Sequence, residues 1–182
     1  MIRDAFAADH RLYICGNGGS FADSLHIVSE LMKSFEKRRA LTAADKQRLN
    51  GQFGQETLIR YLERGLPAVA LGANPALTTA LLNDIDEKEI LFAQELFVLG
   101  RPGDVLLGIS TSGNARDVLL AMSVARAGGL RTAALTGRGG GLLKKSVEMA
   151  VIVPGRATRE IQQAHQIVYH MLCLMLEKYF FG

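Results

Sequence analysis

The chain has little of three features that would narrow its function at once: cysteine, charge of one sign and long apolar runs. Its two cysteines, Cys15 and Cys173, each lie inside an apolar run, which favours buried free thiols in a reducing compartment over a disulfide. The 21 basic and 18 acidic residues nearly balance, so we expect no nucleic-acid partner. No secretory signal is visible and no apolar run approaches the ~20 residues of a membrane-spanning helix, so we expect a cytoplasmic protein without a membrane partner.

Short apolar segments alternate with amphipathic segments along the 182 residues. Strand candidates are residues 12–15, 68–71, 105–109, 132–135 and 149–153. Helical patterns fill residues 21–37, 75–82, 87–99, 115–127 and 159–179. Short strands buried on both sides, with helices between them, predict a flavodoxin-like α/β fold, a three-layer αβα sandwich around a five-stranded parallel sheet. We expect residues 1–182 to form a single domain.

Three of the predicted strands end in turns that are rich in glycine and hydroxyl groups. Residues 16–20 contain three glycines and open a helix at Ser20, residues 110–114 read Ser-Thr-Ser-Gly-Asn, and residues 136–141 contain four glycines. Backbone amides at a helix start, together with hydroxyls, bind phosphate without a net charge. Neither a P-loop nor a dinucleotide fingerprint is present. A single turn of this kind is as often a tight connection as a ligand site. Ligands of parallel sheets bind at the strand ends, so the repetition of these turns there predicts a phosphate site.

His26 and Glu30 lie one i,i+4 step apart on the helix that follows the first turn, which puts both side chains on one stripe. Taken alone, His26 is more often a core or surface histidine, and Glu30 an exposed helix charge. An imidazole and a carboxylate beside an anchored substrate can instead transfer protons. We therefore expect the charged end of a substrate to bind at the turn and its reacting end to lie beside these two side chains of the helix.

The chain resembles the sugar isomerase (SIS) domain family, and within it the phosphoheptose isomerases. The matching segments are CGNGGSFADSLHIVSEL at 15–31, LPAVAL at 66–71, Asn83-Asp84, GDVLLGISTSGNARDVLLA at 103–121, ALTGRGGG at 134–141, and the helix at 162–170. The resemblance implies the SIS fold and an aldose–ketose isomerase. Its implied reaction converts sedoheptulose 7-phosphate to D-glycero-D-manno-heptose 7-phosphate through an enediol.

The resemblance also implies roles for individual residues. Glu30 and His170 correspond to the catalytic acid–base pair. A zinc ion is expected on His26, Glu30, Gln162 and His170. The phosphorylated sugar substrate is expected to contact Asn17, Gly18, Ser20, Asp84, Ser110, Thr111, Ser112, Asn114 and Gln162. Gln162 and His170 are eight residues apart, about 12 Å along one helix, so they share a metal only if their side chains lean toward each other.

Two other functions stay open from the residues alone: isomerisation of another phosphosugar, and a non-catalytic SIS module that senses a phosphosugar or binds a protein. The combination of His26, Glu30, Gln162 and His170 favours catalysis.

The apolar run around Met171 and Met175 predicts that the last helix packs on more than one side. The resemblance implies a homotetramer with active sites between subunits.

Residues 38–65 depart most from the family, whose members cross this gap with few residues. Thr42 and Asp45 predict a capping box, so we expect a helical insert of one or two helices. The insert either lies near the site mouth and affects substrate size or subunit packing, or is a plain surface excursion. Three arginines in polar runs, and one histidine near the start, are expected to be solvated: Arg38, Arg39, Arg138 and His10. His165 is expected to be structural or exposed.

Overall fold

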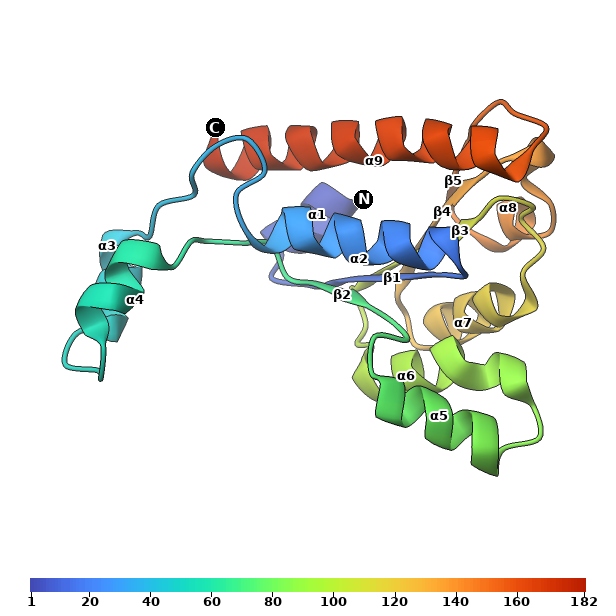
Figure 1. Ribbon diagram of the computed structural model, residues 1–182, viewed down its shortest axis with the longest axis horizontal. Helices are drawn as coiled ribbons and strands as arrows, with labels where there is room; N and C mark the ends of the chain where they lie inside the picture. Colours follow the sequence, from blue (N-terminus) through green and yellow to red (C-terminus); the bar gives the residue numbers. More distant parts are fainter.

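The computed structural model describes all 182 residues and is built on a five-stranded parallel sheet (Figure 1). The strands are β1 (Leu12–Gly16), β2 (Ala68–Ala70), β3 (Val105–Ser110), β4 (Arg131–Thr136) and β5 (Met149–Ile152), in the order β2-β1-β3-β4-β5. The predicted α/β fold class and all five predicted strands are confirmed, with ends that shift by at most one residue. The direction of strand addition reverses between β1 and β3, which is where open α/β sheets bind ligands.

Helices cover both faces of the sheet. On one face lie α1 (Ile2–Ala7), α2 (Gly19–Met32) and α9 (Thr158–Phe181), and on the other lie α5 (Pro75–Asp84), α6 (Leu91–Leu99) and α7 (Arg116–Ala127). Two short helices, η1 (Lys88–Ile90) and α8 (Leu143–Ser146), lie in the connections. None of these helices combines the length and the apolar character that crossing a bilayer requires.

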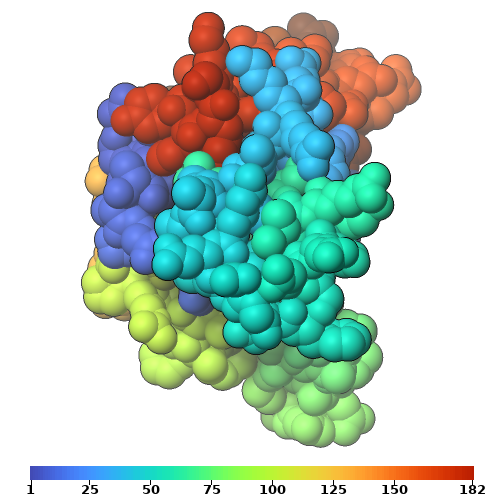
Figure 2. Space-filling model, turned by 90° about the vertical axis from the view of Figure 1, so that its left-hand side faces the viewer, coloured from blue at the N-terminus to red at the C-terminus, as the bar shows by residue number.

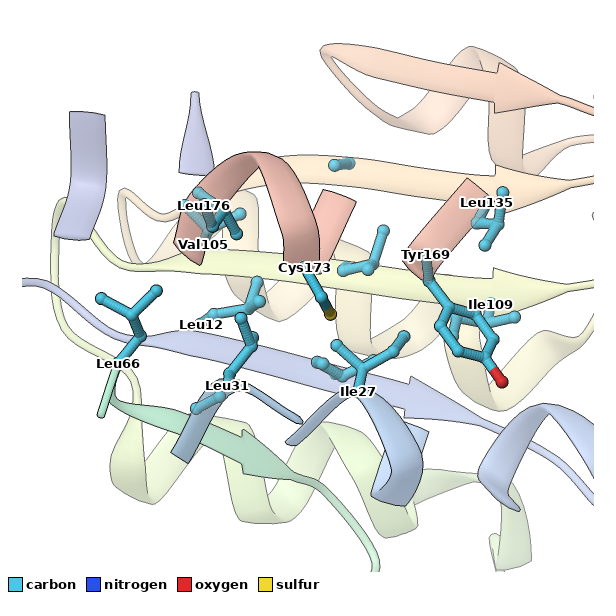
Figure 3. Close-up of a cluster of buried hydrophobic side chains, with 14 of the residues drawn as sticks. Leu12, Ile27, Leu31, Leu66, Val105, Ile109, Leu135, Tyr169, Cys173 and Leu176 are labelled. Atoms are coloured by element: carbon cyan, nitrogen blue, oxygen red, sulfur yellow. The ribbon is translucent and has the colours of Figure 1, made fainter. Parts of the chain in front are cut away.

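Each face of the sheet carries its own core, because side chains alternate along a strand. Leu12 and Ile14 of β1 pack with α2 and α9, whereas Tyr13 and Cys15 pack with α6 and α7. Figure 3 shows the first of these clusters, with side chains from α2, α9 and the sheet directed toward one another and the Tyr169 hydroxyl at its edge. The packing of α2 on α9 therefore belongs to the core of the fold.

Two sequence predictions about the elements were wrong, and two helices were missed. Helix α2 ends at Met32 instead of residue 37, because Lys33 is extended and the carbonyls of Glu30 and Leu31 accept hydrogen bonds from a side chain. The two short helices α1 and α8 were not predicted. Strand β5 is not buried on both sides, because Met149 and Val151 are exposed.

The segment between α2 and β2 contains two helices, α3 (Ala43–Leu49) and α4 (Gln55–Tyr61). The predicted capping box is present: the Thr42 hydroxyl accepts from the amide of Asp45, whose carboxylate accepts from the amide of Thr42. The pair projects from one end of the molecule (Figure 1), and Figure 2 shows it in cyan and teal in front of that end. Neither helix buries a residue.

A buried ion pair ties the start of this segment to α9. Arg39, expected to be solvated, is almost completely buried, and its Nε donates to the Glu177 carboxylate at 2.9 Å. Its two terminal nitrogens donate to the carbonyls of Leu31 at 2.6 Å and Glu30 at 3.0 Å. Burial alone would raise the pKa of Glu177, but three backbone amides from residues 35–37 and Arg39 hold it below the ordinary value. Arg39 thus caps the last turn of α2.

Replacing Arg39 by methionine is expected to lower the free energy of unfolding by about 3–5 kcal/mol, because it leaves the buried Glu177 carboxylate without its counter-ion. Arg38→Met is the matched control, since that side chain is exposed and makes one hydrogen bond, to the Arg60 carbonyl; its cost is expected to stay below about 1 kcal/mol. Urea denaturation measures both. Equal losses in the two variants would contradict the capping role of Arg39.

Candidate active site

The three glycine-rich turns lie side by side at the carboxyl edge of the sheet. Strand register pairs Gly16 with Ile109 and Ser110 with Thr136, so the turns after β1, β3 and β4 are neighbours. A Cβ on Gly16 would lie 2.9 Å from the Ile109 carbonyl oxygen, so a side chain there would displace the backbone of β3. The sequence requires glycine at this point for packing as well as for access to the backbone amides.

The second and third turns are linked by hydrogen bonds. The Asn114 carboxamide oxygen accepts from the amide of Leu142 at 3.0 Å, and the Gly113 carbonyl accepts from the amide of Leu143 at 2.9 Å. Within the second turn, the Ser110 hydroxyl accepts from the amide of Gly113 and the Ser112 hydroxyl from that of Asn114, each at 3.2 Å. These bonds hold the loop that bears the predicted phosphate-binding hydroxyls.

The predicted phosphate ligands differ in exposure. Ser20 and Ser110 are buried, Thr111 and Ser112 are half-buried, and Asn114 is exposed. Asn17 is also exposed, and its side-chain amide donates to the Asp117 carboxylate at 3.0 Å, which joins the first turn to the start of α7. A cleft of about 210 Å³ adjoins the first turn and is lined by Gly16, Asn17, Gly18, Phe21, Gly72, Thr78, Leu91 and Phe92.

The predicted acid–base residues come together from two helices that are far apart in the sequence. On α2, the Nε2 atom of His26 lies 3.2 Å from Oε1 of Glu30. From α9, the His170 ring approaches the His26 ring edge-on, with centroids 5.0 Å apart. Glu30 is mostly buried and His26 is half-buried. The two helices therefore bring Glu30 and His170 to the same imidazole.

Two residues that sequence reasoning missed, Tyr169 and Asp23, complete this group. The Tyr169 hydroxyl lies 3.1 Å from Nδ1 of His26 and 3.3 Å from Oδ1 of Asp23. Burial, reinforced by the Asp23 carboxylate, raises the pKa of Tyr169, so its hydroxyl keeps its proton at neutral pH. Burial also raises the pKa of Asp23. Tyr169 could be mistaken for a core aromatic residue, whereas the position of Asp23 three residues before His26 was a usable signal.

Two of the predicted site residues, Gln162 and Asp84, lie away from the His26 group. The Gln162 side chain rests against Gly19 at the start of α2, seven residues or about 10 Å along the helix from His26. Asp84 is exposed at the end of α5, where its carboxylate accepts from the Asn83 side chain at 2.8 Å. Gln162 therefore lies at the phosphate end of α2, and Asp84 contacts none of the other predicted residues. His165 is fully buried in α9.

The side chains around His26 carry nitrogen and oxygen donors that bear on metal binding. The structure holds no group of three or more His, Cys, Asp or Glu side chains in metal-binding proximity. The chemistry of the donors nevertheless suits zinc, since two imidazoles and one carboxylate are among its usual ligands. In addition, Nε2 of His170 is buried without any hydrogen-bond partner, as expected for a nitrogen that is kept available for a ligand.

Gly113→Ala is expected to disrupt the linked turns, because Gly113 has a φ of +68° and a Cβ there would collide with the backbone of Gly140. Gly139→Ala is the matched control: its φ is +79°, but nothing lies within 4 Å of its Cβ. The control is expected to lose about 1–2 kcal/mol of stability from backbone strain alone, and Gly113→Ala clearly more. Thermal or urea unfolding measures both, and equal losses would show that the two turns are not locked together.

Comparisons with known proteins show which family the chain resembles. Residues 42–137 match the model of the SIS domain family. The phosphoheptose isomerase of Akkermansia muciniphila is 38% identical over 179 residues, which cover 98% of this chain and 82% of that protein. The phosphoheptose isomerase of Crocosphaera subtropica is 39% identical over 182 residues, covering 100% and 80% of the two chains.

Solved structures give the same result. A phosphoheptose isomerase from Francisella tularensis superposes with a TM-score of 0.79 at 27% identity, covering 97% of this chain and 81% of that one. The phosphoheptose isomerase of Neisseria gonorrhoeae superposes with a TM-score of 0.77 at 29% identity and the same coverage. The resemblance to the family is thus confirmed, and the chain belongs to the SIS-domain family and, within it, to the phosphoheptose isomerases.

Proposed function

We propose that this protein is an aldose–ketose isomerase that converts sedoheptulose 7-phosphate to D-glycero-D-manno-heptose 7-phosphate. One observation carries the proposal: α2 and α9 bring Glu30, His26 and His170 together, and the same α2 helix starts in the first glycine-rich turn. Membership of the phosphoheptose isomerases supports this substrate.

The phosphate group is proposed to bind at the carboxyl edge of β1 and β3. The amides at the start of α2 and the hydroxyls of Ser20, Ser110, Thr111 and Ser112 supply donors there. Asn17, Gly18, Asn114 and Gln162 lie in or against the same turns and are proposed to contact the phosphate or the adjacent hydroxyls. Asp84 is proposed to bind substrate only within an assembly of subunits.

The distance along α2 agrees with a long sugar. From Ser20 to His26 is six residues, or about 9 Å of helix. An extended seven-carbon chain with C–C bonds of about 1.5 Å, together with its phosphate ester, spans on the order of 10 Å. A substrate whose phosphate sits at the first turn therefore brings its first two carbons to the level of His26. A three-carbon sugar phosphate would fall well short.

The isomerisation needs a base that removes a proton from the carbon next to the carbonyl and an acid that protonates the carbonyl oxygen. We propose that Glu30 takes a proton from C1 of the ketose while His170 protonates the carbonyl oxygen on C2, which gives the enediol. Glu30 then returns the proton to C2, and His170 accepts the proton of the C1 hydroxyl as the new carbonyl forms.

Zinc is the proposed cofactor, and His26, Glu30 and His170 would hold it. When bound, zinc would polarise the substrate carbonyl as a Lewis acid. Gln162 is proposed as a ligand only if its side chain leaves Gly19.

Both cysteines are free and buried, which supports the proposed reducing, cytoplasmic location.

Glu30→Gln and His170→Ala are each expected to lower kcat/KM for sedoheptulose 7-phosphate by about 10²–10⁴-fold, because each removes one partner of the proton transfer. Formation of the aldose product measures turnover. Glu56→Gln and His10→Asn are the matched controls, since both side chains lie outside the site, and both are expected to keep wild-type rates. Wild-type turnover that survives either site substitution would refute the assignment. If the protein turns over only a different phosphosugar, the roles assigned to Glu30 and His170 stand and the proposed substrate is wrong.

We further propose that the chain forms a homo-oligomer, a tetramer by its resemblance to the family. The outer face of α9 exposes Ile167, Met171 and Met175 by 64%, 57% and 67%. An apolar cavity of about 350 Å³ continues this face to Met149 on the exposed side of β5. A contiguous apolar surface of this kind marks a protein interface. The insert, 38–65, is proposed to join the same assembly, because α3 and α4 bury nothing within one chain.

Met171→Asp combined with Met175→Asp is expected to convert the oligomer into a smaller species, because two carboxylates in an apolar interface cannot be solvated. Light scattering after size-exclusion chromatography gives the mass of each species. Thr158→Asp with Gln166→Asp adds the same two negative charges at exposed positions of α9 that lie outside this apolar face. If the wild type is monomeric, or if the methionine variants assemble normally, the α9 face is not the interface.

A further inference from the structure

We propose that Tyr169 and Asp23 are positioning residues that hold His26 in one tautomer, with its proton on Nδ1 and a lone pair on Nε2 directed at Glu30. This inference rests on the proposed function of the site. It adds two residues that neither the glycine-rich turns nor the acid–base pair requires.

The hydrogen-bond donors can be counted. The Tyr169 hydroxyl has one proton and two neighbours, Oδ1 of Asp23 at 3.3 Å and Nδ1 of His26 at 3.1 Å. An ionised carboxylate can only accept, so the phenol proton is directed at Asp23. The phenol oxygen is then left as an acceptor, and Nδ1 of His26 must supply the donor. Nε2 of the neutral ring is therefore unprotonated.

An unprotonated Nε2 affects the contact between His26 and Glu30. Nε2 of His26 lies 3.2 Å from Oε1 of Glu30, so a lone pair would face a carboxylate oxygen, and two acceptors at that distance repel each other. A cation between the two atoms removes this repulsion. The Asp23–Tyr169 pair thus prepares the His26–Glu30 pair to receive an electrophile, as outer-shell carboxylates do for metal-binding histidines.

The surroundings keep Tyr169 in place. Its ring is 2% exposed in the core between α2, α9 and the sheet, and Figure 3 shows its hydroxyl at the edge of that cluster. The ring also stands edge-on to His170, with centroids 4.8 Å apart. A phenol held from both helices can fix the orientation of His26 more firmly than solvent could.

The direct test is the protonation state of the His26 ring nitrogens, read by long-range ¹H–¹⁵N NMR; the chain has only four histidines, which simplifies assignment. The full-length protein is measured as purified and after dialysis against a chelator, because a metal on Nε2 would impose the same tautomer by itself. We expect Nδ1–H in the wild type in both samples. In Tyr169→Phe we expect that preference to be lost after dialysis, and Asp23→Asn to shift the ring in the same direction.

Two further readouts separate positioning from folding. Competition with a chromophoric chelator is expected to show zinc affinity about 10-fold lower in Tyr169→Phe, and kcat is expected to fall while KM for the sugar phosphate stays near the wild-type value. Tyr179→Phe is the matched control, an exposed tyrosine on the same helix, and is expected to change neither.

The proposal is overturned if wild-type His26 carries its proton on Nε2 after dialysis, or if Tyr169→Phe keeps the wild-type tautomer and zinc affinity. If the wild type does not turn over sedoheptulose 7-phosphate, the proposed function fails, and the NMR result still decides the role of Tyr169.

Discussion

The structure depends on one contact, the packing of α2 against α9 on the face of β1 and β3. These helices are separated by more than 120 residues, yet they run side by side over their length (Figure 1). Gln162 meets Gly19 at their beginning, Tyr169 meets His26 at the middle, and Glu177 reaches the loop after α2 through Arg39 at the end. A change in this register would separate Glu30 from His170.

The same contact relates the two halves of the proposed site. Helix α2 begins at the glycine turn and carries His26 two turns and Glu30 three turns later, so one rigid element links part of the proposed phosphate site to half of the proposed acid–base pair. The sheet fixes the other side, because β1 and β3 are neighbours and their turns end at the same edge. Rigid elements hold reacting groups more precisely than loops do.

The strands and part of the candidate site could be predicted from the sequence. The features that could not be predicted depend on contacts between distant segments. Strand positions follow from short apolar runs between glycine turns, and the His26–Glu30 pair follows from the 3.6-residue period, because both signals are local. The burial of Arg39 could not be predicted, since its partners are Glu177 and two carbonyls of α2, which only the fold brings to it. Tyr169 was missed for a related reason, because a phenol in an apolar helix has no visible partner until α2 is placed beside it. The position of Gln162 likewise depends on the register of the two helices.

A crystal structure with sedoheptulose 7-phosphate bound would reveal this proposed arrangement directly. We expect the phosphate on the turns at Ser20 and Ser110–Ser112, with C1 and C2 lying between Glu30 and His170. Phosphate bound elsewhere, or a sugar whose first two carbons lie away from both of those side chains in every subunit, would contradict it.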